Sequence, residues 1–206
     1  MEGEGDQQKV TGVSVEGGEI LDADTVIICM GPWSNEAREW FGGALPPMYG
    51  QKYHSLLYEN ARTLTQAVFF QGLGDPEVYP RPEGEVYVTG YPDNPIVVTE
   101  TPGQEEVREE VCDRLEGAMK LVSSELAGAT IHTKQSCHLP VSADGNPVIG
   151  KIPGAKGAYV ASGHSCWGIL NGPATGLAVA ELVMDGKASC VDISAFDPKR
   201  FAGISF

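Results

Sequence analysis

The stretch at residues 161–186, ASGHSCWGILNGPATGLAVAELVMDG, decides the fold of the region around it. The apolar residues 158–161 lead into it and are typical of a buried strand. Helical spacing then relates Leu177, Ala180, Glu181 and Met184. Between strand and helix stand Gly163, Gly168 and Gly172. A helix that begins after glycines offers unpaired N–H groups and a positive dipole end, which suit an electron-rich or anionic group.

Composition narrows the partners of this chain. Its 206 residues, 42% of them hydrophobic, suffice for a core in one domain or two interleaved ones. The formal charge of −14 opposes binding to nucleic acid and to anionic membrane surfaces. The sequence has neither an apolar run of about 18 residues nor a charged-then-apolar leader, so we expect no membrane span, no secretion signal and a cytoplasmic location. Five scattered cysteines indicate reduced thiols.

The first part of the chain reads as a strand–turn–helix unit. We expect the acidic, glycine-rich opening to Gln8 to be disordered and order to begin near Lys9. A strand ending in the apolar residues 26–30 is typical of a parallel sheet buried on both faces. Residues 31–34 then break the strand, and Ser34 can cap a helix that continues through Phe41.

The middle of the chain predicts an antiparallel sheet and one long helix. Strands are expected at residues 54–58, 66–70 and 85–89, and another at 129–137. The segment 101–104, TPGQ, resembles a capping box that opens a helix extending to Leu126. The apolar stripe of this helix comprises Val107, Val111, Leu115, Met119, Val122 and Leu126.

Three other kinds of site can be weighed from the sequence. Gly163 and Gly168 have the glycine spacing of a phosphate-binding P-loop, which requires Lys and Ser/Thr after its second glycine. Ile169 and Leu170 stand there instead, so a P-loop is excluded. A papain-like use of Cys166 requires a histidine downstream, and all four histidines precede it. Zinc binding by residues 137–138 and 164–166 is disfavoured, because neighbouring strand residues point to opposite faces. We expect one buried thiol and one hydrogen-bonded imidazole at residues 137–138, and no metal site.

Several separated segments, in order along the chain, resemble the FAD-dependent oxidoreductases of the D-amino-acid oxidase, glycine oxidase and sarcosine oxidase (DAO) family. The resemblance extends from Lys9 to the C-terminus and matches only the C-terminal half of these enzymes. It is carried by residues 23–34, 50–51, 80–87, 144–150, 163–164, 167–170 and 173–176.

The resemblance implies an α+β fold, in which a remnant of a Rossmann-like FAD-binding domain flanks an antiparallel substrate-domain sheet with one long helix. Residues 1–47 and 139–206 would form two parts of the FAD-binding domain, and residues 48–138 the β-rich substrate domain. FAD would be the cofactor, and an amine or amino acid the substrate, oxidised by hydride transfer from a C–N unit to the flavin. The implied cofactor-binding residues are Gly31, Pro32, Gly163, His164, Trp167, Gly168, Ile169 and Leu170. No catalytic side chain is assigned.

Two departures from the family pattern qualify this expectation. The N-terminal dinucleotide-binding unit is missing, since no G-x-G-x-x-G follows a predicted strand. We therefore expect a fragment completed by a missing N-terminal segment or a partner chain, or alternatively a noncatalytic truncated member that acts as an interaction or structural protein. Amino-acid-oxidising relatives carry an arginine that pairs with the substrate carboxylate, and Leu139 stands at that place here. Arg81 could replace that arginine by residue type only.

Overall fold

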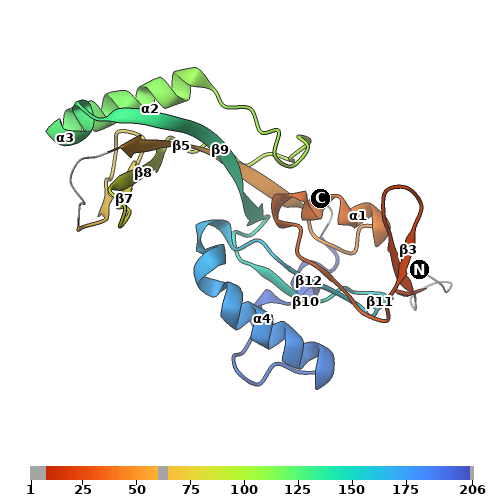
Figure 1. Cartoon of the computed structure of the whole chain (residues 1–206). Helices are drawn as coiled ribbons and strands as arrows, with labels where there is room; N and C mark the ends of the chain where they lie inside the picture. Colours follow the sequence, from red (N-terminus) through yellow and green to blue (C-terminus); the bar gives the residue numbers. More distant parts are fainter. Residues whose placement is uncertain (1–7, 60–64, 205–206) are drawn as a thin grey trace. The chain divides into compact units, whose positions relative to one another are not determined.

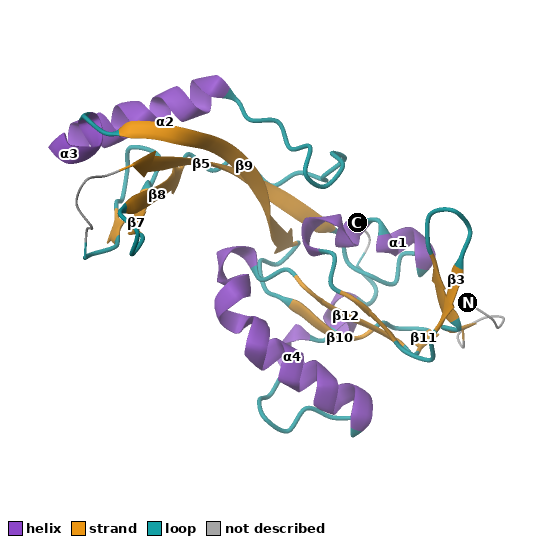
Figure 2. Cartoon of the chain, viewed as in Figure 1, coloured by secondary structure: helices purple, strands orange, loops and turns teal. Residues whose placement is uncertain are grey.

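The computed structural model describes residues 8–59 and 65–204 (Figure 1). The predicted disorder concerns residues 1–7, which lie outside the described residues, and Gln8 belongs to a strand. The fold is a mixture of helices and strands, coloured by type in Figure 2. The chain divides into two compact units. Unit 1 comprises residues 1–50, 96–98 and 139–206, and unit 2 comprises residues 51–95 and 99–138. The predicted domain limits at 47/48 and 138/139 stay a prediction.

Unit 1 is organised around a small mixed sheet. The strands of unit 1 are β1 (Gln8–Lys9), β2 (Gly12–Ser14), β3 (Ile20–Asp22), β4 (Val26–Ile28), β10 (Val148–Lys151), β11 (Ala155–Lys156) and β12 (Ala158–Ser162). The three-stranded sheet has the order β10-β12-β4, in which β12 is parallel to β4 and antiparallel to β10. The parallel β4–β12 pair confirms the expectation of parallel pairing. β1 pairs in parallel with β11, and β2 and β3 form an antiparallel hairpin.

The helices of unit 1 follow its strands. They are the 3-10 helices η1 (Gly31–Asn35), η2 (Ser165–Trp167), η3 (Ser194–Phe196) and η4 (Pro198–Phe201), and the α-helices α1 (Ala37–Trp40) and α4 (Gly168–Met184). The helix predicted through Phe41 is split into η1 and α1, and Glu36 rather than Ser34 precedes α1. The helix predicted after β12 is confirmed as α4. None of the helices in the described ranges has the length and apolar content required to cross a bilayer.

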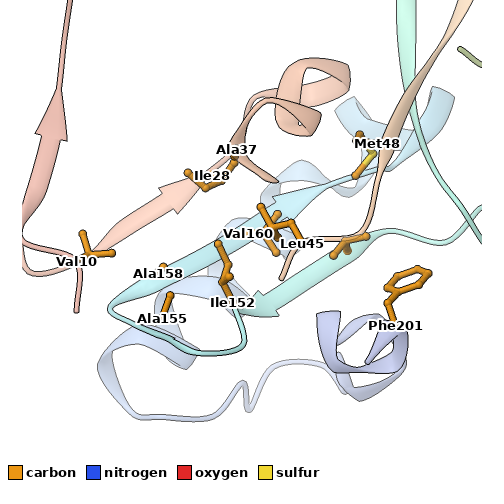
Figure 3. Packing of buried hydrophobic residues seen from close by; sticks show 11 residues of the cluster. Val10, Ile28, Ala37, Leu45, Met48, Ile152, Ala155, Ala158, Val160 and Phe201 are labelled. Carbon is orange, nitrogen blue, oxygen red and sulfur yellow. The ribbon is translucent and has the colours of Figure 1, made fainter. Parts of the chain in front are cut away.

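The core of unit 1 joins these segments although they are distant in sequence. Figure 3 shows apolar side chains from β4, α1 and β12 converging with Leu45 and Met48. Burial of apolar surface stabilises a fold by roughly 25 cal/mol per Å². The buried members of this cluster are Val10, Ile28, Ala37, Leu45, Met48, Val148, Ile152, Ala155, Ala158, Val160 and Phe201. This core fixes the turns that leave the carboxyl ends of β4 and β12.

The prediction that residues 26–30 are buried on both faces is wrong. Ile28 is buried, but the side chain of Ile27 is 42% exposed and Cys29 is also exposed. The reason is that Ile27 and Cys29 line the groove that lies between this sheet and α4, where no side chain packs closely on them. The face that carries Ile27 therefore lacks the cover that a continuous apolar run predicts.

Unit 2 is an antiparallel sheet with a helix packed on one face. Its five strands have the order β6-β7-β8-β5-β9. They are β5 (Met48–Glu59, which starts in unit 1), β6 (Val68–Phe69), β7 (Glu77–Pro80), β8 (Glu85–Gly90) and β9 (Thr130–Ser142, which ends in unit 1). The helices are α2 (Glu109–Val122) and α3 (Ser124–Ala127). The predicted stripe of α2 is confirmed at Val111, Leu115 and Met119, which are buried. Leu115 and Met119 belong to one apolar cluster with Leu56, Val86 and Val88.

The predicted helix start at the TPGQ segment is wrong. Gly103 has φ +84°, a left-handed conformation that cannot continue a right-handed helix. The segment forms a turn closed by Gln104 N–H to Thr101 O at 3.0 Å. The helix starts instead at Glu109, after Arg108, whose backbone N–H binds the His54 imidazole. The hydrogen bond between Arg108 and His54 thus fixes the loop before α2, in place of the helix start that the capping-box pattern predicts.

Candidate functional site

Two glycine turns meet at one edge of the unit 1 sheet. β4 and β12 are parallel, so their carboxyl ends lie at the same edge. Gly31 and Pro32 open η1 after β4, whereas Gly163 and His164 follow β12 and lead into η2 and α4. The structure thereby brings together the residues that the sequence assigned to the cofactor from positions about 130 residues apart.

Ser162 connects the two turns directly. Its hydroxyl donates a hydrogen bond to the backbone oxygen of Gly31 at 3.0 Å. The hydroxyl of Ser34 contacts Ser162 Oγ at 3.2 Å, and both serines are buried. The sequence analysis missed this role of Ser162 and read Ser34 as a helix cap. The only sign of this contact in the sequence is a serine after each predicted strand, and such serines are too common to indicate a contact.

The turn after β12 has an unusual backbone that its sequence accommodates. Gly163 has φ +84°, and an added Cβ would lie 3.3 Å from Met48 Cε and 3.6 Å from Asn146 O. The positive φ favours glycine at this position, and an added Cβ would also require Met48 to shift slightly. Ser165 also has a positive φ, 51°, which is uncommon for a residue with a side chain. This turn directs the chain from the buried strand into α4.

The start of α4 is open to a ligand. Its N-cap residue, Trp167, makes no side-chain capping bond, and no acidic residue stands in the first turn. The first N–H groups of a helix have no partner within the helix, and its dipole is positive at this end. Ile169 is 98% exposed and Leu170 is 72% exposed. The donor set of this helix end therefore fits an electron-rich or anionic group.

A groove of about 370 Å³ lies between the β4–β12 sheet and α4. Ile27 and Ala161 contribute from the strands, and Gly168, Gly172 and Gly176 form a small-residue face on the helix. His164 also lines the groove, with its Nε2 atom 3.0 Å from Thr175 Oγ1. Burial lowers the pKa of His164 from its ordinary value, so the imidazole is neutral at pH 7.

The segment 80–87 contributes structure to unit 2. Arg81 forms an ion pair with Glu85 and stacks over the Tyr87 ring, with its guanidinium carbon 5.5 Å from the ring centroid. Its backbone N–H also donates to Glu85 O at 2.8 Å. These contacts close the β7–β8 hairpin, so Arg81 is engaged in a turn.

A buried charge network in unit 2 escaped the sequence analysis. Glu100 binds Lys52 Nζ through Oε1 at 2.7 Å and His138 Nε2 through Oε2 at 2.6 Å. The hydrogen bond from Lys52 is the main cause that lowers the pKa of Glu100 to about 2. His138 is a hydrogen-bonded imidazole as predicted, but the prediction that Cys137 is buried is wrong, because its residue lies on the exposed face of β9. Within the described ranges, no three His, Cys, Asp or Glu residues are grouped to hold a metal ion.

Comparison with known proteins identifies the family. The sequence matches the family of FAD dependent oxidoreductases (DAO) over residues 2–182. The protein TDA3 of Saccharomyces cerevisiae is 34% identical over 194 residues, which cover 89% of this chain and 36% of that protein. Glycine oxidase of Pseudomonas putida is 27% identical over 204 residues, which cover 95% of this chain and 50% of that enzyme.

Solved structures share the fold. L-proline dehydrogenase from P. horikoshii matches with a TM-score of 0.80 and 23% identity, over 96% of this chain and 51% of that one. Glycine oxidase from Geobacillus kaustophilus matches with a TM-score of 0.79 and 24% identity, over 94% of this chain and 50% of that one. The chain spans about half the length of these relatives, or less. It belongs to the DAO family of FAD-dependent oxidoreductases, whose cofactor is FAD.

Proposed function

We propose that this chain forms the flavin-ring side of a FAD site in an oxidoreductase that acts on amine-type small molecules. The observation that carries the proposal is the meeting of two glycine turns at one sheet edge, joined by the Ser162–Gly31 hydrogen bond, beside the uncapped start of α4. The proposed contacts with the cofactor come from Gly31, Pro32, Gly163, His164, Trp167, Gly168, Ile169 and Leu170.

Each part of this site has a distinct task. When bound, FAD accepts the hydride equivalent from the carbon beside the substrate nitrogen. The N–H groups at the start of α4 stabilise negative charge at the edge of the ring that they face. Thr175 orients the neutral His164 imidazole, which can therefore accept or donate one hydrogen bond at the groove. Trp167, which is exposed, supplies an apolar surface.

The substrate is proposed to be an amine whose recognition does not use Arg81. That guanidinium already binds Glu85 and stacks on Tyr87, so recruiting it for a substrate carboxylate would break both contacts. Leu139 offers no charge at the place where amino-acid-oxidising relatives carry arginine. A cytoplasmic location, and the expectation that nucleic acid and membranes are not partners, stay predictions from the charge and hydropathy of the sequence.

We also propose that a further polypeptide segment, from the same protein or a partner chain, completes the unit 1 sheet. β4 has one paired edge in the described part of the structure, and Ile27 is exposed beside it. α4 exposes Ile169, Leu170, Leu177 and Met184. An apolar surface of this kind marks an interaction site. The Rossmann-like character of unit 1 belongs to this proposal, since a dinucleotide-binding unit would supply the contacts to the FAD pyrophosphate.

Flavin binding is the direct test. The 206-residue chain and a form extended upstream are purified, incubated with FAD, separated from free cofactor and measured by visible absorption. Flavin retained by either form supports the proposal, and retention by the extended form alone supports a completing segment. If neither form retains FAD, the cofactor proposal is rejected.

The reaction class needs a second measurement. Glycine, sarcosine, proline and amines without a carboxylate are added anaerobically to the flavin-loaded protein, and loss of the absorption band near 450 nm, typical of oxidised flavins, is followed. Bleaching by an amine supports oxidation of a C–N unit. Retained flavin that none of these compounds bleaches would instead favour the noncatalytic interaction protein, for which the exposed apolar residues of α4 are the supporting observation.

A further inference from the structure

Two buried serines in unit 1 form a directed hydrogen-bond chain. Ser162 is 4% exposed and Ser34 is 3% exposed. Ser162 Oγ lies 3.0 Å from Gly31 O, which can only accept, so the single Ser162 proton points to that carbonyl. Ser162 Oγ in turn accepts from Ser34 Oγ, at 3.2 Å. The order of donation is therefore Ser34 to Ser162 to Gly31.

This chain of bonds adds a side-chain hydrogen bond to the carbonyl of the first residue of η1. The ladder between β4 and β12 ends at the Ile28–Val160 pair, before the chain reaches Gly31. Gly31 then turns with φ +57°. Pro32, which follows, has a fixed φ and no N–H to donate. The Gly31 carbonyl, and with it the start of η1, is therefore held by the hydroxyl of Ser162 as well as by the backbone of η1.

The same serine also borders the second turn. Ser162 is the last residue of β12, and Gly163 follows it with φ +84°. A shift of Ser162 would move Gly163 and His164 on one side and Gly31 and Pro32 on the other. One side chain thus links the two backbone segments to which the proposed function assigns contact with the cofactor.

We infer that Ser162 is a positioning residue that sets the spacing of the two glycine turns for the flavin ring. Ser34 stabilises the Ser162 side chain by donating a hydrogen bond to its hydroxyl. Ser162 acts through the Gly31 carbonyl, because its hydroxyl donates to Gly31 O and accepts from the Ser34 hydroxyl. The inference rests on the proposed flavin site. It gives the two serines unequal effects, because only Ser162 touches both turns.

The unequal effects can be measured without cofactor. Ser162→Ala removes the side-chain hydrogen bond to the Gly31 carbonyl and leaves the Ser34 hydroxyl without its acceptor, whereas Ser34→Ala leaves the Ser162–Gly31 bond in place. In urea unfolding of the full chain, we expect Ser162→Ala to lower the midpoint more than Ser34→Ala. The double variant should equal Ser162→Ala or exceed it in stability, because the two changes act on one chain of bonds. Equal and additive losses would contradict the directed chain.

The flavin role needs a control matched for stability. Val160→Ala changes a side chain in the same strand that is 1% exposed and removes apolar contacts without touching a hydrogen bond of the turns. We expect Ser162→Ala to weaken FAD binding at least tenfold and to shift the absorption maximum of the bound flavin. Val160→Ala and Ser34→Ala should bind FAD within threefold of the unaltered protein, with an unchanged spectrum.

The outcomes separate the inference from the proposed function. If Val160→Ala lowers FAD affinity as much as Ser162→Ala does, Ser162 contributes only to stability and the positioning role is refuted. If the unaltered chain and its extended form both fail to bind FAD, the proposed function fails and the flavin role of Ser162 falls with it. The urea comparison then still decides whether the directed serine chain exists.

Discussion

His54 in unit 2 should make the stability of this chain sensitive to mild acid. The side chain on β5 is fully buried, and its Nε2 atom accepts the backbone N–H of Arg108 at 3.0 Å, just before α2 begins. Burial, followed by the Arg108 cation, lowers the pKa of His54 from its ordinary value of 6.5. A neutral imidazole is required, because a protonated one has no lone pair with which to accept this N–H.

The sign and size of the effect follow from linkage. Since the pKa of His54 is lower in the folded state, the unfolded state takes up a proton first as the pH falls through about 6.5. The contribution of His54 is therefore complete above the unfolded pKa and is lost as the pH falls towards the folded pKa. One proton changes the free energy of unfolding by at most about 1.4 kcal/mol per pH unit in that window. Loss of the acceptor at any pH costs about 1–3 kcal/mol, because the Arg108 N–H loses its partner.

Urea unfolding at pH 7.5, 6.5 and 5.5 measures both effects. His54→Leu should be less stable than the unaltered chain at pH 7.5 and should lose less stability between pH 6.5 and 5.5. His54→Gln offers an amide oxygen as acceptor, so it should be affected less at pH 7.5 while showing the same flatter dependence. The pKa of His164 is also lowered, and subtracting the variant profile from the unaltered one removes its contribution. Parallel profiles for the unaltered chain and His54→Leu would refute the reasoning.

Three further substitutions, two of them with a control substitution, test other parts of the structure by urea unfolding. Gly163→Ala should cost about 1–3 kcal/mol through backbone strain, whereas Gly176→Ala, in open space on α4, should be neutral or stabilise by up to about 1 kcal/mol. Glu100→Gln should cost about 2 kcal/mol, because it leaves a buried ammonium poorly paired. Glu116→Gln should change stability by less than about 0.5 kcal/mol, because Glu116 is partly exposed and its partner Lys120 is half exposed. Arg200→Met removes both hydrogen bonds to the carboxylate of Asp144, in the turn between β9 and β10, and should cost about 1 kcal/mol. No loss of stability at pH 7 would contradict that role.

The sequence was most informative where local chemistry and tertiary contacts agree. β12, the turn at Gly163 and α4 were predicted because apolar run, glycines and helical spacing follow one another within a short segment. The start of α2 was mispredicted, since the capping signal at Thr101 competes with Glu100, which binds residues distant in sequence. Pairing of Glu100 with Lys52 and His138 cannot be read from periodicity, because each residue alone resembles a solvated charge.

The candidate site was predicted in its parts and missed in its connection. Gly31, Pro32 and Gly163 were named from the family resemblance, and their turns could be predicted because glycine permits a left-handed backbone and proline fixes φ. Ser34 and Ser162 were missed, because a serine gives no local sign of whether its hydroxyl meets water or a carbonyl 131 residues away. The parallel register of β4 and β12 decides that contact, and register is a tertiary property.

The exposed apolar side chains of α4 begin beside the turns to which the proposed function assigns the cofactor. Ile169 and Leu170 stand at the uncapped start of α4, while Leu177 and Met184 continue the exposed apolar surface along the same helix. A segment that covers this helix would remove apolar area from water, which stabilises by roughly 25 cal/mol per Å² buried. It would also exclude water from the N–H groups at the helix start and strengthen their interaction with negative charge on a flavin. Under the proposed function, covering of α4 and tight flavin binding are therefore coupled, so a segment that improves one should improve the other.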